Sequence, residues 1–299
     1  MKYFARVAEF LRACEIECQY SPHTLKAYKS DLAHFTRFLD NQTAENPIDV
    51  LKAYLVHMHA QEMLSVSTLR RRIATLKSYA KFVNEREAWE NPFESWKPLL
   101  KPPKRLPKIL PKTSVKRLVR VDESEQDIFR ETAIAVMLIS GTGVRVSELC
   151  AIDCADIEPD ASRIRIRGKG SKDRFVYLTN GSLRALIERK LGTNSSLHPQ
   201  TAFFLNSRGN RLSPQTFRRR LREWAGECGL SERVTPHMLR HSAATLLIEA
   251  GVNLRFVQRL LGHASISTTE LYTHVSDVSL KDALVKADTV GNLLDDFAA

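Results

Sequence analysis

The stretch Thr142-Gly143-Val144-Arg145-Val146-Ser147-Glu148-Leu149 lies near the middle of this 299-residue chain, and the interpretation of the rest depends on it. Its counterpart is His237-x-x-Arg240, which Leu261-Gly262-His263 and then Tyr272 follow. Arginine holds phosphate through forked, charge-assisted hydrogen bonds, histidine donates or shuttles protons, and a tyrosine hydroxyl can act as a nucleophile. Together these residue types are typical of an enzyme that attacks a phosphodiester without a metal ion.

With Lys169 added, six positions of the chain, in this order and each in its local context, resemble the catalytic set of the tyrosine recombinases, most closely their bacterial Xer-type branch: Arg145, Lys169, His237, Arg240, His263 and Tyr272. The resemblance covers almost the whole chain, with a looser match over the first hundred residues. It implies an all-α, SAM-like N-terminal domain and a mainly helical (α+β) catalytic domain with a small β-hairpin or sheet. It also implies that the two domains form a C-shaped clamp on DNA.

The charge of a phosphodiester explains why two arginines are expected in such a site. The group repels nucleophiles, so catalysis depends on neutralising the negative charge that grows in the transition state. Arg145 and Arg240 are therefore the candidates for holding the two non-bridging oxygens. Glu148 lies one turn after Arg145 and can hold its guanidinium in place. An isolated arginine would instead be interpreted as half of a surface salt bridge.

The resemblance implies roles for the remaining residues of the set. Tyr272 is the expected nucleophile that forms a 3′-phosphotyrosyl intermediate, and cationic neighbours would lower its pKa, which is near 10 in free tyrosine. Lys169, in a Gly-Lys-Gly element, resembles the lysine that protonates the departing 5′-oxygen, and Lys172 is its rival. His237 and His263 are expected to complete the hydrogen bonds to the phosphate and the nucleophile.

The charge balance of the chain points to an anionic partner. Lysine and arginine number 45 against 34 aspartates and glutamates, which gives a formal net charge of +11 at pH 7. Such a chain favours nucleic acid or anionic membranes. No apolar run approaches the ~20 residues that span a bilayer, and early glutamates such as Glu9 do not fit a signal peptide. We expect double-stranded DNA as partner, no membrane, and a cytoplasmic, nucleoid-associated location.

Motifs for cofactors are missing from the sequence. It has no Gly-x-x-x-x-Gly-Lys-Ser/Thr loop for ATP and no acidic cluster at the spacing of a two-metal site. The pairs Cys14/Cys18 and Cys150/Cys154 are each four residues apart, but a zinc site needs further ligands at matching spacing. We predict no metal ion and no cofactor.

A basic, proline-rich segment is the predicted domain boundary. Residues 101–120 contain four prolines and eight basic residues without an acid, a composition that suits a strap crossing a DNA backbone. The prediction places a helical N-terminal core DNA-binding domain at 1–100 and the linker at 101–112. The catalytic domain with its C-terminal docking helix then covers 113–299.

Hydrophobic periodicity predicts the main elements within these domains. Ser67 is the expected N-cap of an N-terminal-domain helix whose inward face carries Leu69, Ile73, Leu76, Tyr79, Phe82 and Val83. Strict alternation at 163–167, then a glycine turn and residues 174–178, predicts a β-hairpin. Further helices are expected at 128–140, after Ser213-Pro214, at 238–250 and at 253–261.

Basic side chains on these elements are candidates for DNA contact. The helix after Ser67 has no acid between 63 and 84, so its basic face is either an ordinary solvated face or a phosphate-contacting one. The linker, the hairpin turn and the helix after Ser213 supply the others. The candidates are Arg70, Arg71, Arg72, Lys77, Lys81, Lys104, Arg105, Lys108, Lys172, Arg218, Arg219 and Arg220.

The tail after Tyr272 carries an apolar stripe at helical spacing: Leu280, Ala283, Leu284 and Ala287. An amphipathic helix of this kind can pack on its own domain or on a neighbouring protomer. The resemblance favours the neighbour, within a homo- or hetero-tetramer on a specific recombination site. An activator protein is a further candidate partner.

The sequence leaves several functions in competition. The resemblance implies a site-specific DNA recombinase that needs neither metal nor ATP and resolves chromosome or plasmid dimers. A recombinase of a mobile element, for integration or excision, has the same plan. A type IB topoisomerase-like enzyme shares the chemistry without a specific site. Residues 248–272, with two helical segments around Gly251, also fit a non-catalytic helix-turn-helix reader, which has no use for Arg145 and Tyr272.

Overall fold

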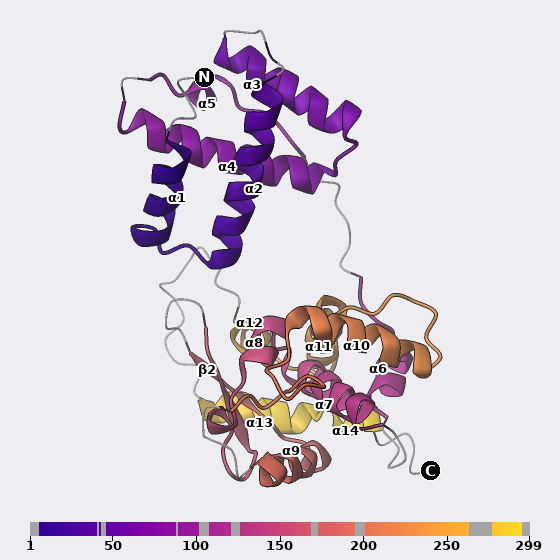
Figure 1. The fold of residues 1–299 in the computed structure, drawn as a ribbon. Coiled ribbons are helices and arrows are strands. Elements are labelled where there is room, and N and C mark those ends of the chain that lie inside the picture. Colours follow the sequence, from indigo (N-terminus) through magenta and orange to yellow (C-terminus); the bar gives the residue numbers. More distant parts are fainter. Residues whose placement is uncertain are drawn as a thin grey trace. The chain divides into compact units, whose positions relative to one another are not determined.

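The computed structural model describes residues 6–40, 42, 46–87, 89–101, 108–120, 126–168, 173–194, 201–262 and 277–294. The chain forms two compact units, Met1–Arg105 (unit 1) and Leu106–Ala299 (unit 2), each with its own hydrophobic core (Figure 1). The described residues are mainly helical, with one two-stranded sheet, which confirms the predicted fold class. The clamp formed by the two domains stays a prediction.

Unit 1 is all-helical over its described residues. Polar side chains determine where its helices begin: Ser21, Asn46, Ser65 and Asn91 each accept a hydrogen bond from a first-turn N–H. The elements are α1 (Val7–Ile16), α2 (Pro22–Leu39), α3 (Pro47–Val56), the π-helical turn η2 (His57–Gln61), α4 (Val66–Asn84) and α5 (Pro92–Ser95).

The predicted helix of unit 1 is present as α4, with one difference at its start. Ser65, not Ser67, is the N-cap, because its Oγ accepts the Thr68 N–H at 3.3 Å. The predicted inward face is confirmed: the six residues from Leu69 to Val83 named above are all buried. This face packs on α1, α2 and α5.

Unit 2 is built around α7 (Asp127–Thr142), whose buried run from Thr132 to Ser140 is in contact with α6, α8, α9, α10 and α11. The other elements are α6 (Lys112–Val119), α8 (Val146–Ala151), the 3₁₀ turn η3 (Cys154–Asp156), β1 (Arg163–Ile166), β2 (Arg174–Tyr177), α9 (Gly181–Asn194), α10 (Pro214–Glu227), α11 (Pro236–Glu249), α12 (Leu254–Leu261), α13 (Asp277–Ala287) and α14 (Gly291–Leu294). No described helix is long and apolar enough to cross a membrane.

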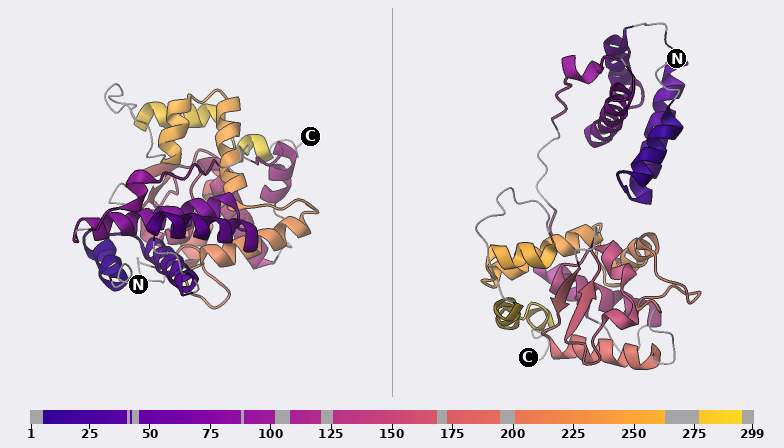
Figure 2. Two further views of the ribbon diagram at one scale, coloured as in Figure 1. Left: turned by 90° about the horizontal axis from the view of Figure 1, so that it is seen from above. Right: turned by 90° about the vertical axis from the view of Figure 1, so that its left-hand side faces the viewer.

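The predicted hairpin is present as β1 and β2, which pair antiparallel and are drawn as two arrows in the right-hand view of Figure 2. Ile164 faces Val176 in the register, and both side chains are fully buried. Ile166 faces Arg174 at the end nearest the turn, and residues 169–172 of that turn lie outside the described residues.

The C-terminal segment packs on its own unit in this structure. Leu284, Ala287, Val290 and Leu293 are buried in the unit 2 core, and α14 contacts α6. A Cβ at Gly141 would come within 2.7 Å of Val290 Cγ2, so the glycine leaves room for this packing. In the isolated chain Leu284 and Ala287 of the apolar stripe are therefore covered from within, while the side chain of Leu280 lies outside the described residues. Docking of the stripe on a neighbouring protomer stays a prediction.

Candidate active site

The turn between α7 and α8 positions Arg145. α7 ends at Gly143, which has a left-handed φ of +66° and whose Cβ would come within 2.3 Å of Leu261 Cδ2. The left-handed φ and the close approach to Leu261 both favour glycine at this position. Arg145 follows as the N-cap of α8, where its backbone N–H donates to Glu148 Oε2 at 2.8 Å. The guanidinium of the same residue donates to Glu148 Oε1 at 2.8 Å.

Arg240 reaches the same turn from α11. Its side chain is 7% exposed, and Nη1 donates to the Gly143 carbonyl at 2.5 Å while Nη2 donates to the Leu261 carbonyl at 2.6 Å. Burial, together with the neighbouring Arg145 and Arg174 charges, lowers the pKa of Arg240 to about 10. Arg145 and Arg240, 95 positions apart in the sequence, thus meet at the turn after α7.

The last turn of α12 is the common partner of three arginines. The carbonyls of Leu260, Leu261 and Gly262 accept hydrogen bonds from Arg174 Nε at 3.0 Å, Arg240 Nη2 at 2.6 Å and Arg145 Nη2 at 3.0 Å, respectively. The final carbonyls of a helix lack partners within the helix and carry its negative partial charge, so cations are stabilised there. α12 therefore collects positive charge at its end, one residue before His263.

Glu148 is the one acidic side chain among these arginines for which the structure gives contacts. Burial alone would raise the pKa of this carboxyl, but hydrogen bonds from Arg174 and from the Arg145 backbone hold the pKa below its ordinary value. Arg174 binds it through both terminal nitrogens, Nη1 to Oε1 at 3.1 Å and Nη2 to Oε2 at 2.8 Å. The sequence interpretation treated Arg174 only as a strand residue; its position directly after a basic turn was the signal available.

The structure describes only part of the expected catalytic set. It brings Arg145, Glu148 and Arg240 together, and it places His237 three residues before Arg240 in the first turn of α11, where the imidazole is exposed. The other expected residues lie outside the described residues: Lys169, Lys172, His263 and Tyr272. Their catalytic roles stay predictions.

The candidate DNA contacts divide by exposure. Arg70, Arg71, Lys77 and Lys81 on α4, Lys108, and Arg218 and Arg219 on α10 are exposed, while Lys104 and Arg105 lie outside the described residues. Arg220 differs from the expectation: it is 3% exposed, Nη1 donates to the Leu205 carbonyl at 3.0 Å, and Glu131 lies 3.6 Å away. Arg72 also turns inward, with a side chain 15% exposed.

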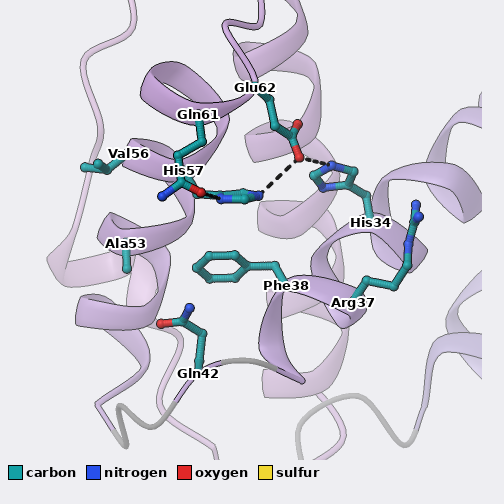
Figure 3. Close-up of a pocket in the computed structure, with 9 residues that line it drawn as sticks. All are labelled: His34, Arg37, Phe38, Gln42, Ala53, Val56, His57, Gln61 and Glu62. Carbon is teal, nitrogen blue, oxygen red and sulfur yellow. Dashed lines mark hydrogen bonds and ion pairs between the residues drawn. The ribbon is translucent and has the colours of Figure 1, made fainter.

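A pocket of about 590 Å³ lies in unit 1 (Figure 3). His34 and His57 both point toward Glu62 there, with Nε2 to Oε1 distances of 2.8 and 3.2 Å, and the Phe38 ring lies 5.1 Å from the His57 ring. Gln61 bonds the second nitrogen of His57 at 2.5 Å. These polar groups are already paired with one another. Across the described residues, no group of three or more His, Cys, Asp or Glu side chains is placed to hold a metal ion.

Comparison with known proteins identifies the family. Residues 108–278 match the family model "Phage integrase family", and residues 7–87 match "Phage integrase, N-terminal SAM-like domain". The chain belongs to the phage integrase family. A "Tyrosine recombinase XerC" from Halalkalibacterium halodurans is 34% identical over 297 residues, covering 92% of this chain and 94% of the relative. Another from Myxococcus xanthus is 35% identical over 281 residues, covering 90% and 92%.

Solved structures share the fold. The XerH recombinase bound to palindromic difH substrate has a TM-score of 0.67 at 22% identity, covering 93% of this chain and 83% of that one. A lambda integrase fragment bound to a core site has a TM-score of 0.66 at 19% identity, covering 90% and 99%. The predicted family, its Xer-type branch and the predicted enzyme class, a tyrosine-type site-specific DNA recombinase, are confirmed by the relatives and the family models.

Proposed function

We propose that this phage integrase family member cleaves and rejoins the strands of double-stranded DNA at a specific site through a 3′-phosphotyrosyl intermediate, without metal or ATP. The observation that carries the proposal is the convergence of Arg145 and Arg240 on the end of α12, with Glu148 behind Arg145. The start of α8, α11 and the end of α12 are far apart in the sequence, and they bring the two guanidiniums to one place. Such a pair of cations suits the binding of a single anionic group.

The two arginines would hold the non-bridging oxygens of the scissile phosphate. A guanidinium has five N–H donors, and the contacts described above use two of them on Arg240 and two on Arg145. Donors therefore remain for the phosphate. Because Arg240 is anchored to two carbonyls, it needs little rearrangement when charge grows on the oxygens, and such preorganised donors lower the barrier most.

The proton transfers are assigned to the remaining members of the family set. Tyr272 would pass its hydroxyl proton to a histidine acceptor, attack phosphorus and form the phosphotyrosyl ester. The bond to the 5′-oxygen breaks in the same step, with Lys169 as the proton donor to that oxygen. His237 and His263 would bond the phosphate and the nucleophile. The ester conserves the energy of the broken bond, so a 5′-hydroxyl from another strand can reverse the step and exchange strands without net hydrolysis.

The DNA grip is assigned to the exposed basic residues of both units that lie outside the Arg71–Asp31 ion pair: Arg70, Lys77, Lys81, Lys108, Arg218 and Arg219. Phosphate contacts of this kind give affinity that falls steeply with salt. We propose assembly on DNA as a homo- or hetero-tetramer, linked by the C-terminal segment, and the resolution of chromosome or plasmid dimers as the outcome. The names of the curated relatives support the Xer-type role.

Trapping the covalent intermediate tests the reaction. Cells that produce the protein are lysed in denaturant, protein-linked DNA is recovered and sequenced, and a nicked duplex of the recovered sequence is then cleaved in vitro with EDTA present. We expect a covalent adduct that is absent from Tyr272→Phe. Binding without an adduct would indicate a non-catalytic DNA reader, and adducts spread without sequence preference, with relaxation of supercoils, would indicate a topoisomerase-like enzyme.

A further inference from the structure

Arg145, Glu148, Arg240 and the end of α12 are called the arginine site below. All the side-chain hydrogen bonds described for Arg174 go to this site. It is the first residue of β2, and its side chain is 16% exposed. Nε bonds the Leu260 carbonyl of α12, while Nη1 and Nη2 bond the two oxygens of Glu148 on α8. One planar side chain on the hairpin thus joins α8 to α12.

The fit of Arg174 to this place has a second, separate support in the backbone. Gly262 ends α12 with a left-handed φ of +63°, and a Cβ there would come within 3.3 Å of the Arg174 Cζ and Nη1 atoms. That distance is tighter than ordinary van der Waals contact, so a side chain at residue 262 would press on the guanidinium. The glycine thus both ends the helix and leaves room for Arg174 against it.

The balance of charge gives a reason for Glu148 to bind a second arginine besides Arg145. Glu148 fixes Arg145 in two ways, through its guanidinium and its backbone N–H. If Glu148 faced Arg145 alone, the carboxylate would cancel the positive charge that a phosphate requires. Because Arg174 binds the same carboxylate in a bidentate manner, Glu148 can orient Arg145 while the cluster of Arg145, Arg174 and Arg240 keeps an excess of positive charge.

We propose that Arg174 is a positioning residue of the recombinase site: it holds Glu148 and the last turn of α12 so that Arg145 presents its free donors to the scissile phosphate. This role rests on the proposed phosphate site but needs no contact of Arg174 with DNA. Arginine is required rather than lysine, since an ammonium cannot bind both carboxylate oxygens and the carbonyl in one plane.

The chain offers a matched control on the partner strand. Arg165 of β1 also binds a buried carboxylate with two nitrogens, Nε and Nη2 to Asp156 Oδ1 at 3.0 and 2.8 Å. Asp156 does not touch Arg145, Glu148 or α12 among the contacts described. Arg165→Met therefore removes an arginine–carboxylate pair from the same hairpin without touching the arginine site, and Asp156 keeps Arg167 as a partner.

The first test needs no DNA. In the full chain labelled with ¹⁵N-arginine, the guanidinium protons of Arg145 and Arg240 are followed by NMR, after assignment with Arg145→Lys and Arg240→Lys. We expect Arg174→Met and Arg174→Lys to shift the Arg145 signals and speed their exchange with water, and Arg165→Met to leave both unchanged. Unchanged Arg145 signals in Arg174→Met would overturn the proposal.

The second test measures single-turnover cleavage of the nicked duplex recovered by adduct sequencing, at saturating protein. We expect Arg174→Met and Arg174→Lys to lower the cleavage rate by about 10- to 100-fold, with DNA affinity little changed. Losing a residue that positions a phosphate donor should slow cleavage less than losing the donor itself. Arg174→Met combined with Glu148→Gln should be no slower than the slower single variant.

The outcomes separate the two claims. If Arg174→Lys restores the wild-type rate, or if Arg165→Met is as slow as Arg174→Met, the positioning role is wrong. If the wild-type protein forms no adduct while the NMR signals respond as expected, the proposed reaction fails but Arg174 still holds Glu148 and Arg145.

Discussion

Both units contain arginines packed against buried or half-buried carboxylates, but the balance of charge differs. In unit 1, Arg71 and Arg72 of α4 face Asp31 and Glu62, so two arginines meet two carboxylates. In unit 2, Glu148 binds Arg145 and Arg174, and no acid binds Arg240 among the contacts described. All three arginines also bond carbonyls at the end of α12. The first cluster is neutral and holds helices together. The second keeps a surplus of positive charge and free donors, which is what binding a phosphate requires.

The largest expected effect follows from exchanging arginine for lysine in each cluster. Both changes keep the charge and remove the planar fork. Arg240→Lys is expected to lower the single-turnover cleavage rate by about 10²–10³-fold, because one preorganised donor pair is lost from the phosphate site. Arg72→Lys is expected to cleave at close to the wild-type rate. Equal losses in the two variants at saturating protein would show that charge balance does not distinguish the clusters.

The second prediction concerns stability, where a change in the unit 1 cluster should have the larger effect. The Asp31 side chain is 1% exposed and accepts hydrogen bonds from Arg71 and from Thr75 Oγ1, the latter at 2.8 Å. Asp31→Asn leaves the arginines without their buried partner, which typically costs about 3–5 kcal/mol. We expect amide hydrogen exchange in urea to show unit 1 destabilised and unit 2 unchanged. Loss of protection in both units would argue against separate cores.

The sequence alone could predict some of this contrast and not the rest. Arg145, Glu148 and Arg240 lie in motifs whose local pattern predicted that they belong to one site, and the helix and hairpin periods were sufficient to predict the elements around them. The carbonyls of Leu260 and Gly262 could not be identified as partners, because the contacts to Arg174 and Arg145 span 86 and 117 positions. No local pattern encodes such pairs.

The inward-facing arginines have a related cause. Arg72 and Arg220 lie within runs of three arginines, so periodicity alone does not show which member turns inward. The outcome depends on acids elsewhere in the chain: Glu62, 3.3 Å from Arg72, and Glu131, 3.6 Å from Arg220. A basic run is therefore a poor guide to DNA contact until the positions of the acids that pair with its members are known.

A smaller effect is expected on DNA affinity. Variants of two neighbouring arginines on α4 distinguish a loss of DNA affinity from a loss of stability. Arg70 is exposed, whereas Arg72 is bonded to His34 and Glu62. Arg70→Gln should weaken DNA binding and reduce the slope of log affinity against log salt by about 1, as the loss of one phosphate contact does. Arg72→Gln should leave the slope unchanged and lower the stability of unit 1. Identical salt slopes for wild type and Arg70→Gln would remove α4 from the proposed DNA surface.

The smallest expected effect concerns the pH dependence of unit 1. Burial, and then the positive charge of Arg72, lower the pKa of His34, although Glu62 acts in the opposite direction. The unfolded chain, with the ordinary value near 6.5, therefore binds a proton more readily than the folded one. Stability should be fully present above that value and should fall as the pH drops from 7 toward 5. Glu62, whose pKa is also lowered, loses its contribution only in more acidic solution.

Histidine variants isolate this contribution. His34→Gln keeps a polar partner for Tyr54 and Glu62, which bond the imidazole at 2.8 Å each, but cannot take up a proton. We expect unit 1 amide protection in His34→Gln to be nearly constant between pH 7 and 5, while the wild type and the exposed-site control His59→Gln both lose protection. If His34→Gln keeps the full pH dependence, a group other than His34 takes up the proton, and the loss of unit 1 stability between pH 7 and 5 does not come from His34.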